Sequence, residues 1–445
     1  MAKHSRTPIY LQAGAPRIIT ADLLTALPPR GIIPSEGTRY LGQGGWYSST
    51  GKREEHMADN ITHGLAAALL AQAGLRQRYG ALATVALLVG SELPDFDALF
   101  ELGGPVSAFV HHRGITHSLL GGAGLAFFGA ALLWSVWRSH PYWRMAWLMY
   151  LGVLLHIGMD YLTSYGTQIF LPFSTGHYTI DAVYIVDFTY SALMITGLLL
   201  VRMIRWQRQE CYGRASLAWV GLGGIVWFAA PALAERPLTL LALQSAGLHV
   251  IAFALVVALV AWSCRHWKEH RAVVLGRVGV GLVLGYIALC VMTHAIAQQQ
   301  MAHALGPQMA HVRRLAALPL PGGGPLQWRV IAVTDATYLV SRVSIFPGTV
   351  TAPQSIAKGP GLDNRVIQAA SQYRLVRVFW DFARFPVIDS YVQEAETVVR
   401  YTDLRFSGDG RNRNWFDLTI HFDPTGQVRV IEFLNRLFHP SHPEF

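Results

Sequence analysis

Long apolar runs constrain this sequence more than any other feature. About six stretches of roughly 20 residues carry almost no charge, which is the length that crosses the hydrocarbon core of a bilayer as a helix. Charged residues make up 14% of the chain, well below the roughly 25% of soluble domains. We therefore predict membrane spans at 118–137, 145–164, 184–204, 216–234, 240–263 and 275–297.

Two shorter apolar segments, 59–75 and 81–93, precede these runs and predict short membrane helices. Arginines cluster in the loops 138–144, 202–214 and 265–277, and the positive-inside rule places such loops in the cytoplasm. The histidine-rich loop before the first long span is then predicted to lie on the extracytoplasmic face. The tail after the last span is predicted on the same face.

The regions outside the spans differ in composition. Residues 1–56 are rich in Gly, Pro and Arg without a signal-peptide pattern, so they predict a poorly ordered extension, and Met57 is a candidate start. Residues 57–300 form the predicted membrane domain, and 301–325 a linker that ends in a Pro/Gly-rich run. Residues 326–445 predict a soluble α+β domain, with a hairpin at 326–345, a helix at 364–385, and strands at 398–406, 415–422 and 428–433. The expected fold is an all-α polytopic bundle followed by this domain.

The charge and the cysteines exclude several function classes. A net charge of +9 would suggest nucleic acid in a soluble protein, but here the arginines lie in short loops between apolar runs. We therefore expect no nucleic-acid partner. Three distant cysteines support neither a disulfide framework nor a thiolate zinc site, and copper or iron–sulfur chemistry is not expected. The oligomeric state stays open.

The run His111–Ser118 brings three histidines and an arginine to the mouth of the first long span. Imidazole is the commonest protein ligand of transition metals, so His117 and one of His111 and His112 are candidate ligands. Arg113 could bind a phosphate or carboxylate through two hydrogen bonds. The alternative for Arg113 is a contact with lipid headgroups.

Other His and Asp residues recur at helical spacing. His156 and Asp160 lie one turn apart in an apolar span, where ionisable groups are paired or functional; the alternative is a hydrogen bond that only joins two helices. His63 follows Asp59 at the same spacing, although Asp59 could be a helix N-cap and His63 interfacial. The acidic pair after Pro94 could equally be an ordinary turn. We predict the metal ligands His63, Asp95, His112, His117, His156 and Asp160.

This mixture of His and Asp ligands is typical of zinc or manganese hydrolytic sites with one or two ions. Such ions lower the pKa of bound water and polarise phosphoryl or carbonyl oxygens. Asp97 or Asp187 is the predicted general base or supporting carboxylate, and Arg113 the predicted substrate-binding residue. The alternatives for Asp187 and Asp97 are a buried acid hydrogen-bonded to a helix neighbour and a helix-ending turn.

Four motifs together resemble the YdjM-like family of bacterial inner-membrane proteins. They are the 59–63 pair, Pro94–Asp97, His112–Ser118 and the run from His156 to Thr167. Family members are described as LexA-regulated, membrane-bound, metal-dependent hydrolases, which implies that activity and the bacterial inner membrane here. The His/Asp pattern is also similar to zinc-dependent phospholipases C, although this chain departs from that pattern in having no second HxxxE helix, so we expect one or two ions.

We therefore expect a multi-pass membrane hydrolase whose metal site and C-terminal domain face the periplasm. Its expected substrate is a phosphoester of a membrane lipid or a lipid-linked molecule, because the site would open where headgroups lie. One alternative is an ion or metal transporter, since intramembrane His and Asp also mark ion pathways. Another is a non-catalytic scaffold that holds a structural metal.

Overall fold

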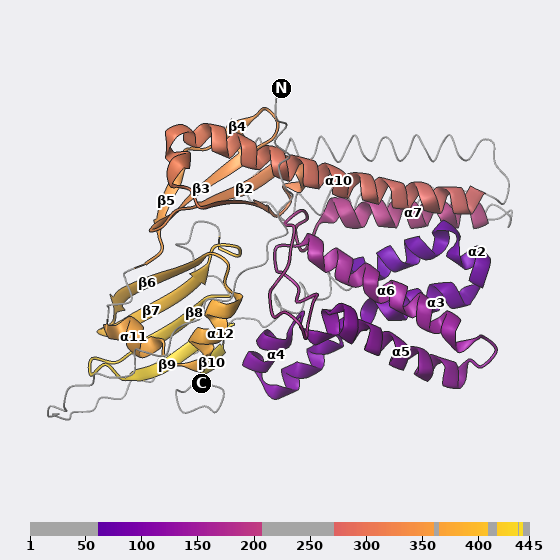
Figure 1. Ribbon diagram of the computed structural model, residues 1–445, viewed down its shortest axis with the longest axis horizontal. Helices are drawn as coiled ribbons and strands as arrows, with labels where there is room; N and C mark the ends of the chain where they lie inside the picture. The colour runs from indigo at the N-terminus through magenta and orange to yellow at the C-terminus, as the bar shows by residue number, and fades with distance from the viewer. Residues whose placement is uncertain (1–60, 207–270, 360–364, 408–415, 435, 439–445) are drawn as a thin grey trace, which may run out of the picture.

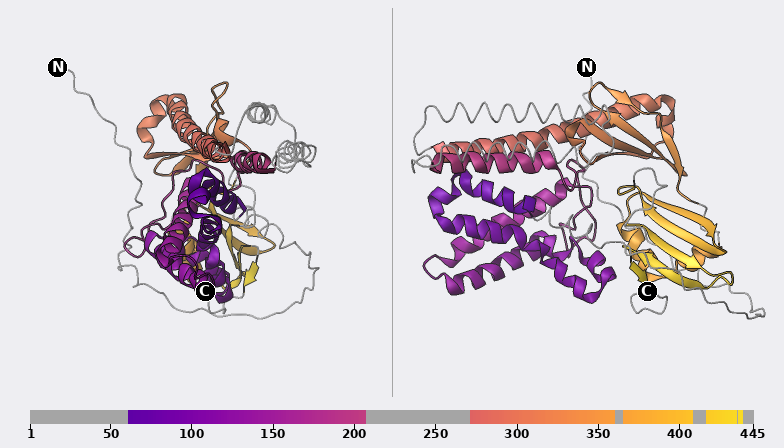
Figure 2. Two further views of the ribbon diagram at one scale, coloured as in Figure 1. Left: turned by 90° about the vertical axis from the view of Figure 1, so that its right-hand side faces the viewer. Right: turned by 180° about the vertical axis from the view of Figure 1, so that it is seen from behind.

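The computed structural model describes residues 61–206, 271–359, 365–407, 416–434 and 436–438. A helical part lies beside two β-sheets (Figures 1 and 2). The predicted extension, the predicted spans at 216–234 and 240–263, and Asp59 lie outside the described residues.

The first helices are short, as the sequence predicts. Residues 61–70 are helical and continue through the π-helical turn η1 (Ala71–Leu75) into α2 (Arg76–Tyr79). Gly80, with φ of 68°, then reverses the chain into α3 (Ala81–Glu92). Pro94 begins the 3-10 helix η2 (Pro94–Gly103), and α4 (Pro105–His111) follows. For η2 and α4, the sequence predicted only a turn at Pro94–Asp97.

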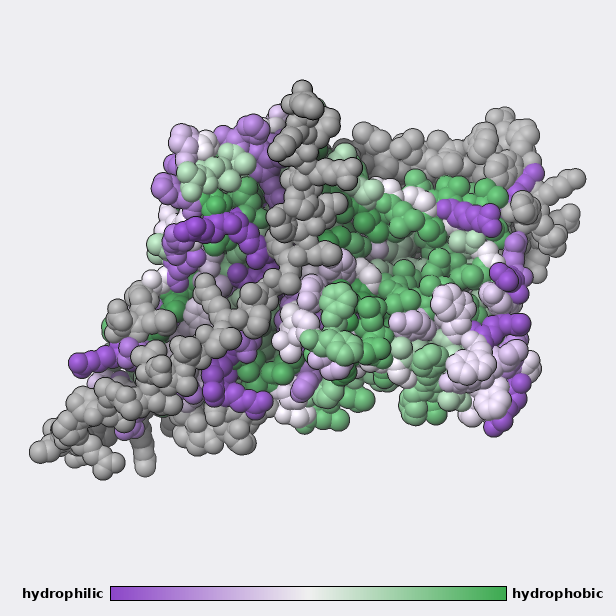
Figure 3. Space-filling view, viewed as in Figure 1, coloured by the Kyte–Doolittle hydropathy of each residue, from purple (hydrophilic) through white to green (hydrophobic). Residues whose placement is uncertain are grey.

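Among the described residues, three helices are long and apolar enough to cross a membrane: α5 (Leu119–Val136), α6 (Tyr142–Leu162) and α10 (Arg271–Leu305), which η4 (Gly306–His311) extends. The helix α7 (Phe188–Trp206) is apolar over a shorter stretch. These four helices correspond to four of the predicted spans, so six long spans are not confirmed. Hydrophobic surface covers much of this helical part (Figure 3).

Close backbone contacts join the helices. At Gly152 of α6, a Cβ atom would lie 2.5 Å from the Leu87 carbonyl oxygen of α3, and at Gly90 of α3 it would collide with the Met149 carbonyl. In the same way Gly197 of α7 meets Gly279 of α10, and these two helices run side by side (Figure 1). The small residues therefore set how deeply α3 sits on α6, and α3 leads directly into the candidate site.

The first sheet continues from α10. Its antiparallel order is β1 (Arg314–Pro319), β2 (Gln327–Val333), β3 (Thr337–Ser344) and β4 (Thr349–Val350), and β5 (Gln354–Ala357) also pairs with β3. Trp328 of β2 is fully buried together with Ala297 and Met301 of α10. The predicted hairpin at 326–345 is thus β2 and β3. The predicted linker 301–325 instead holds the end of α10, η4, β1 and the short η5 (Gly324–Leu326).

The second sheet has the order β10-β9-β8-β7-β6. Its strands are β6 (Pro386–Gln393), β7 (Glu396–Asp403), β8 (Leu418–Phe422), β9 (Val428–Phe433) and β10 (Arg436–Phe438). The amphipathic α11 (Arg365–Ala370) and α12 (Arg374–Phe382) cover one face (Figure 1). The sequence predicted α11 and α12 together with β7 to β9, but it missed β6 and β10. The core of this sheet also takes in Phe109 of α4 and Tyr165, which follows α6.

Candidate metal centre

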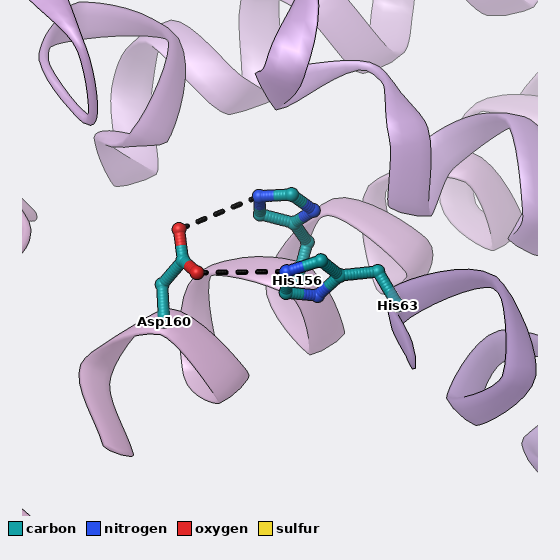
Figure 4. Close-up of side chains that lie close together, drawn as sticks. All are labelled: His63, His156 and Asp160. Carbon is teal, nitrogen blue, oxygen red and sulfur yellow. Dashed lines mark ion pairs between the residues drawn. The ribbon is translucent and has the colours of Figure 1, made fainter. Parts of the chain in front are cut away.

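Five of the six predicted ligands meet at one point in the helical part. They come from four segments, because His63 lies in the first helix, Asp95 in η2, His117 in the 3-10 turn η3 (Ile115–His117), and His156 and Asp160 in α6. Figure 4 shows the rings of His63 and His156 directed at the carboxylate of Asp160. Asp95 is 20% exposed, whereas the other four side chains are at most 2% exposed. The cluster is therefore closed except on the side of Asp95.

Local signals hold these residues in place. Pro94 starts η2 directly after α3, which brings Asp95 back over the end of that helix. The hydroxyl of Ser118 accepts a hydrogen bond from Gly121 N at 2.9 Å and so caps α5, which turns the chain immediately after His117. His156 and Asp160 share a face of α6 because they are four residues apart.

Four donor atoms lie around the rings of His117 and His156, and five of their six separations are close to those of a tetrahedral ion site. Nε2 of His117 lies 3.0 Å from Nε2 of His156 and 3.2 Å from Oδ2 of Asp160. Nε2 of His156 lies 3.4 Å from that same oxygen. Oδ1 of Asp95 is 3.5 Å from each of the two nitrogens. Four ligands at about 2.0–2.1 Å from a tetrahedral zinc would be about 3.3 Å apart, so the donor set fits a divalent metal.

The outer nitrogens of both imidazoles have acceptors. Nδ1 of His156 donates to the Ser91 carbonyl oxygen at 2.6 Å, which leaves its Nε2 lone pair directed at the centre. Nδ1 of His117 lies 3.0 Å from the Thr116 hydroxyl and 3.6 Å from Oδ2 of Asp97. Two ring nitrogens that face each other at 3.0 Å, each with an acceptor behind the ring, suit joint ligation of a cation.

His63 lies behind Asp160. Its Nε2 is 3.5 Å from Oδ1 of Asp160, and its ring stacks on His156 with centroids 3.8 Å apart. His63, His156 and Asp160 form one potential ligand group, and Asp95, His117 and His156 form another. Because both groups use Nε2 of His156, and one ring nitrogen binds one ion, the arrangement favours a single ion.

Asp97 supports the ligands from behind. One of its oxygens accepts from Arg113 N at 2.9 Å and lies 3.1 Å from Nδ1 of His112. Burial opposes ionisation of Asp97, but His112, His117 and the backbone hydrogen bond of Arg113 outweigh it and lower its pKa. Asp97 thus acts as a supporting carboxylate. His112 belongs to neither potential ligand group among the described residues and contacts Asp97 instead, so its place as a ligand stays a prediction.

Arg113 is fixed within the protein. Its backbone has a φ of 56°, its Nη2 is 2.9 Å from Oδ1 of Asp160, and its Nη1 donates to the Thr163 hydroxyl at 2.7 Å. The guanidinium lies 5.0 Å from the centre of the Tyr165 ring, and the side chain is 3% exposed. The guanidinium thus contacts and orients Asp160, and the substrate-binding role of Arg113 stays a prediction.

Asp187 has other partners. Its two oxygens accept from Tyr190 N at 3.0 Å and from the Tyr286 hydroxyl at 2.7 Å. These contacts start α7 and join it to α10. They give no support to Asp187 as a base at the histidine cluster, and they match the alternative of a buried acid with helix neighbours.

Charges within the centre are coupled. Burial disfavours the ionised form of Asp95, but the hydrogen bond with His117 and the charge of His156 outweigh it, so the pKa of Asp95 lies below its usual range. Burial likewise disfavours a charged His117, but its contacts with Asp160 and Asp95 raise its pKa to about 9. A metal ligand must be a neutral imidazole, so metal uptake at this place would release a proton.

Sequence reasoning missed the residues that orient the ligands. Ser91, Thr163 and Tyr165 belong to this group. Thr163 and Tyr165 lie inside the His156–Thr167 motif, so the length of that motif was itself a signal, and Thr116, which the sequence does suggest as a cap or supporting group, contacts His117. Ser91 acts through its backbone carbonyl, for which no side-chain pattern exists.

Comparison with known proteins agrees with the motifs. The YdjM inner membrane protein family matches residues 57–233, as the resemblance indicated. The Bacillus subtilis protein YfhP, described as uncharacterized, is 31% identical over 90 residues, which are 20% of this chain and 28% of YfhP. No solved structure matches. The family match contains the whole candidate metal centre, while α10 and both sheets lie beyond it.

Proposed function

From the match of residues 57–233 to the YdjM inner membrane protein family, we propose that this chain is a membrane-embedded, metal-dependent hydrolase. The observation that carries the proposal is the meeting of donor atoms from Asp95, His117, His156 and Asp160, in which each histidine Nε2 lies 3.0 to 3.5 Å from the other three donors. Buried His and Asp residues in an apolar bundle are costly unless they are paired or functional. Carboxylates that also orient the imidazoles are typical of metal centres.

The donor chemistry favours zinc, with manganese as the alternative. A bound divalent ion would lower the pKa of a water molecule to about 7 and polarise a phosphoryl oxygen. His117, His156, Asp160 and Asp95 would hold the ion, and His63 would support Asp160. Asp95 is the most exposed of these residues, so a substrate would approach from its side.

The surroundings of Asp95 favour a lipid substrate. Phe96, Leu99 and Leu102 are 56%, 63% and 88% exposed, and their spacing of three places them in one row, because a 3-10 helix has three residues per turn. This apolar row begins at the residue after Asp95. The apolar helix α5 starts two residues after His117, so the centre lies at one end of a candidate membrane span. We therefore propose a phosphoester of a membrane lipid or lipid-linked molecule, cleaved at the extracytoplasmic face.

One observation favours a second candidate. Four protein donors would complete a tetrahedral zinc site, and closed sites are typical of structural zinc. A non-catalytic membrane scaffold with a structural ion would have this donor set. A metal ion with six ligands would keep coordination positions open for water and substrate. The identity of the metal and an activity assay therefore separate the hydrolase from the scaffold.

The first experiment is elemental analysis of the detergent-purified full chain, beside His117→Ala and His156→Ala. His303→Ala, at an exposed position of α10, is the matched control. We expect about one zinc or manganese per chain in wild type and control and a loss in both site variants. The metal-loaded protein is then assayed on phospholipid and isoprenoid phosphate vesicles. Metal without hydrolysis would favour the scaffold, and a folded wild type that takes up no metal would refute the hydrolase.

A further inference from the structure

Two segments next to the candidate metal centre pack against the second sheet, β6 to β10, called the C-terminal sheet below. The first is α4, which ends at His111, so its chain leads straight to His112 and Arg113. Its Phe109 ring packs against Phe382 and Phe433, with centroid distances of 4.6 and 5.0 Å. The loop that carries Arg113 is thus anchored on aromatic residues of the second sheet and its covering helix.

The second segment is the chain that leaves α6. Tyr165 follows Asp160 by five residues, and the centre of its ring lies 5.0 Å from that of Phe382 and 5.0 Å from the Arg113 guanidinium. Cation–π contacts of a desolvated arginine orient the guanidinium. Because Arg113 in turn contacts Asp160, the helix α12 that covers the sheet reaches a predicted metal ligand through the side chains of Tyr165 and Arg113.

Arg405 fixes the backbone at this junction. It is 7% exposed, and its Nη1 donates to the Tyr165 carbonyl oxygen at 2.6 Å while its Nη2 donates to the Phe382 carbonyl oxygen at 2.7 Å. Its Nε pairs with Asp403 at 2.8 Å. A bidentate ion pair between Arg384 and Asp181, at 2.7 and 2.8 Å, holds the same loop a little further on.

From these contacts we propose that the β6–β10 sheet is a positioning part of the metal centre and that Tyr165 is the positioning residue that transmits it. The sheet holds the Tyr165 ring, the ring holds Arg113, and Arg113 holds Asp160 in the orientation that ligation needs. The inference rests on the proposed metal site, and it does not depend on hydrolysis. A residue that orients a ligand in this way typically changes metal affinity by about 10- to 100-fold.

The test compares the same substitution at two tyrosines of one hydrophobic core. Tyr165 and Tyr401 are both buried in it, at 6% and 0% exposure, but the ring contacts of Tyr401 are with Phe379 and Trp380 of α12. Zinc affinity of the full chain is measured by competition with a chromogenic chelator, and the melting temperature is measured on metal-stripped protein.

We expect Tyr165→Leu to weaken zinc binding at least about tenfold. Tyr165→Phe keeps the ring and is expected to retain wild-type affinity. Tyr401→Leu is expected to lower the melting temperature as much as Tyr165→Leu does, with zinc affinity within about twofold of wild type. This difference separates positioning from a general loss of stability.

Equal affinities for Tyr165→Leu and wild type would overturn the inference, as would equal losses at both tyrosines. Wild type that binds zinc without cleaving any phosphoester would overturn the proposed hydrolase and leave the inference standing. Wild type that takes up no zinc would overturn both.

Discussion

At the scale of single residues, Asp97 contacts three neighbouring residues of the candidate centre. It accepts from the backbone of Arg113 and contacts His112, and it lies behind the ring of His117. A carboxylate behind an imidazole fixes the tautomer and the direction of the other ring nitrogen.

We therefore predict that Asp97→Asn weakens zinc binding by about 10- to 100-fold, because the amide is neutral and no longer favours an Nδ1–H on His117. Chelator competition measures the change. Asp335→Asn, at a side chain that is 76% exposed on the first sheet, is the matched control and should leave the affinity unchanged. Equal affinity for Asp97→Asn and wild type would contradict the role.

His177 gives a pH dependence that belongs to one residue. Burial first, and then the nearby charge of Arg405, lower its pKa from 6.5 to about 4. The unfolded chain binds a proton at His177 more readily than the folded chain does. The contribution of neutral His177 to the free energy of unfolding should therefore be fully present above about pH 6.5 and be lost as the pH falls toward 4. We predict that His177→Gln flattens the fall of the melting temperature between pH 7 and 5. A slope identical to wild type would count against a buried neutral His177.

At the scale of elements, the crossing of α3 and α6 places the hydrogen-bond acceptor that orients His156. Ser91 near the end of α3 gives its carbonyl oxygen to Nδ1 of His156, and Gly152, one turn earlier on α6, lets the two backbones touch. Glycine inside a helix lowers stability by up to about 1 kcal/mol relative to alanine. At Gly152 the close contact between the two backbones offsets this cost, because a larger residue would prevent it.

Gly152→Ala should therefore separate α3 from α6 and weaken both stability and zinc binding, although alanine is the better helix former. Gly158→Ala on the same helix meets no atom within 4 Å and is the matched control, expected to be neutral or slightly stabilising. Melting temperature and zinc affinity are read together. Similar behaviour of the two variants would show that the crossing tolerates a methyl group.

The sequence predicted the elements that follow a strong periodic or compositional rule. The apolar runs gave α5, α6 and α10, and the alternating pattern gave β2, β3 and β9, which begins and ends where predicted. It missed β1 because Leu318 and Pro319 resemble a linker, and a proline at the end of an edge strand carries no pattern. It also missed α4 and η2, which are short, and short elements take their conformation from packing rather than from propensity.

The residues of the candidate centre were predictable for a related reason. His63, Asp95, His117, His156 and Asp160 are polar residues in or beside apolar runs, where a polar group needs a partner. Arg113, His112 and Asp187 have the same signal, but their partners are Asp160, Asp97 and Tyr286. The sequence can indicate that a polar residue in a membrane protein needs a partner. Which side chains lie around that residue is seen only in the three-dimensional structure.

At the scale of the whole molecule, the candidate centre joins segments that are far apart in the sequence. Residues 61–70, η2, η3 and α6 each contribute one or two donors, and the chain next to η3 and α6 reaches the second sheet and its covering helix α12 through Phe109 and Tyr165. A ligand that binds only the folded chain stabilises it by about 2.7 kcal/mol at 100 times its Kd.

Zinc should therefore raise the melting temperature of the full chain by several degrees, and His156→Ala should abolish this shift. Magnesium, which prefers oxygen ligands, is the control ion and should shift it less. An equal zinc shift in wild type and His156→Ala would mean that zinc acts elsewhere, and the four donors would then be a hydrogen-bonded cluster that joins the helices without an ion.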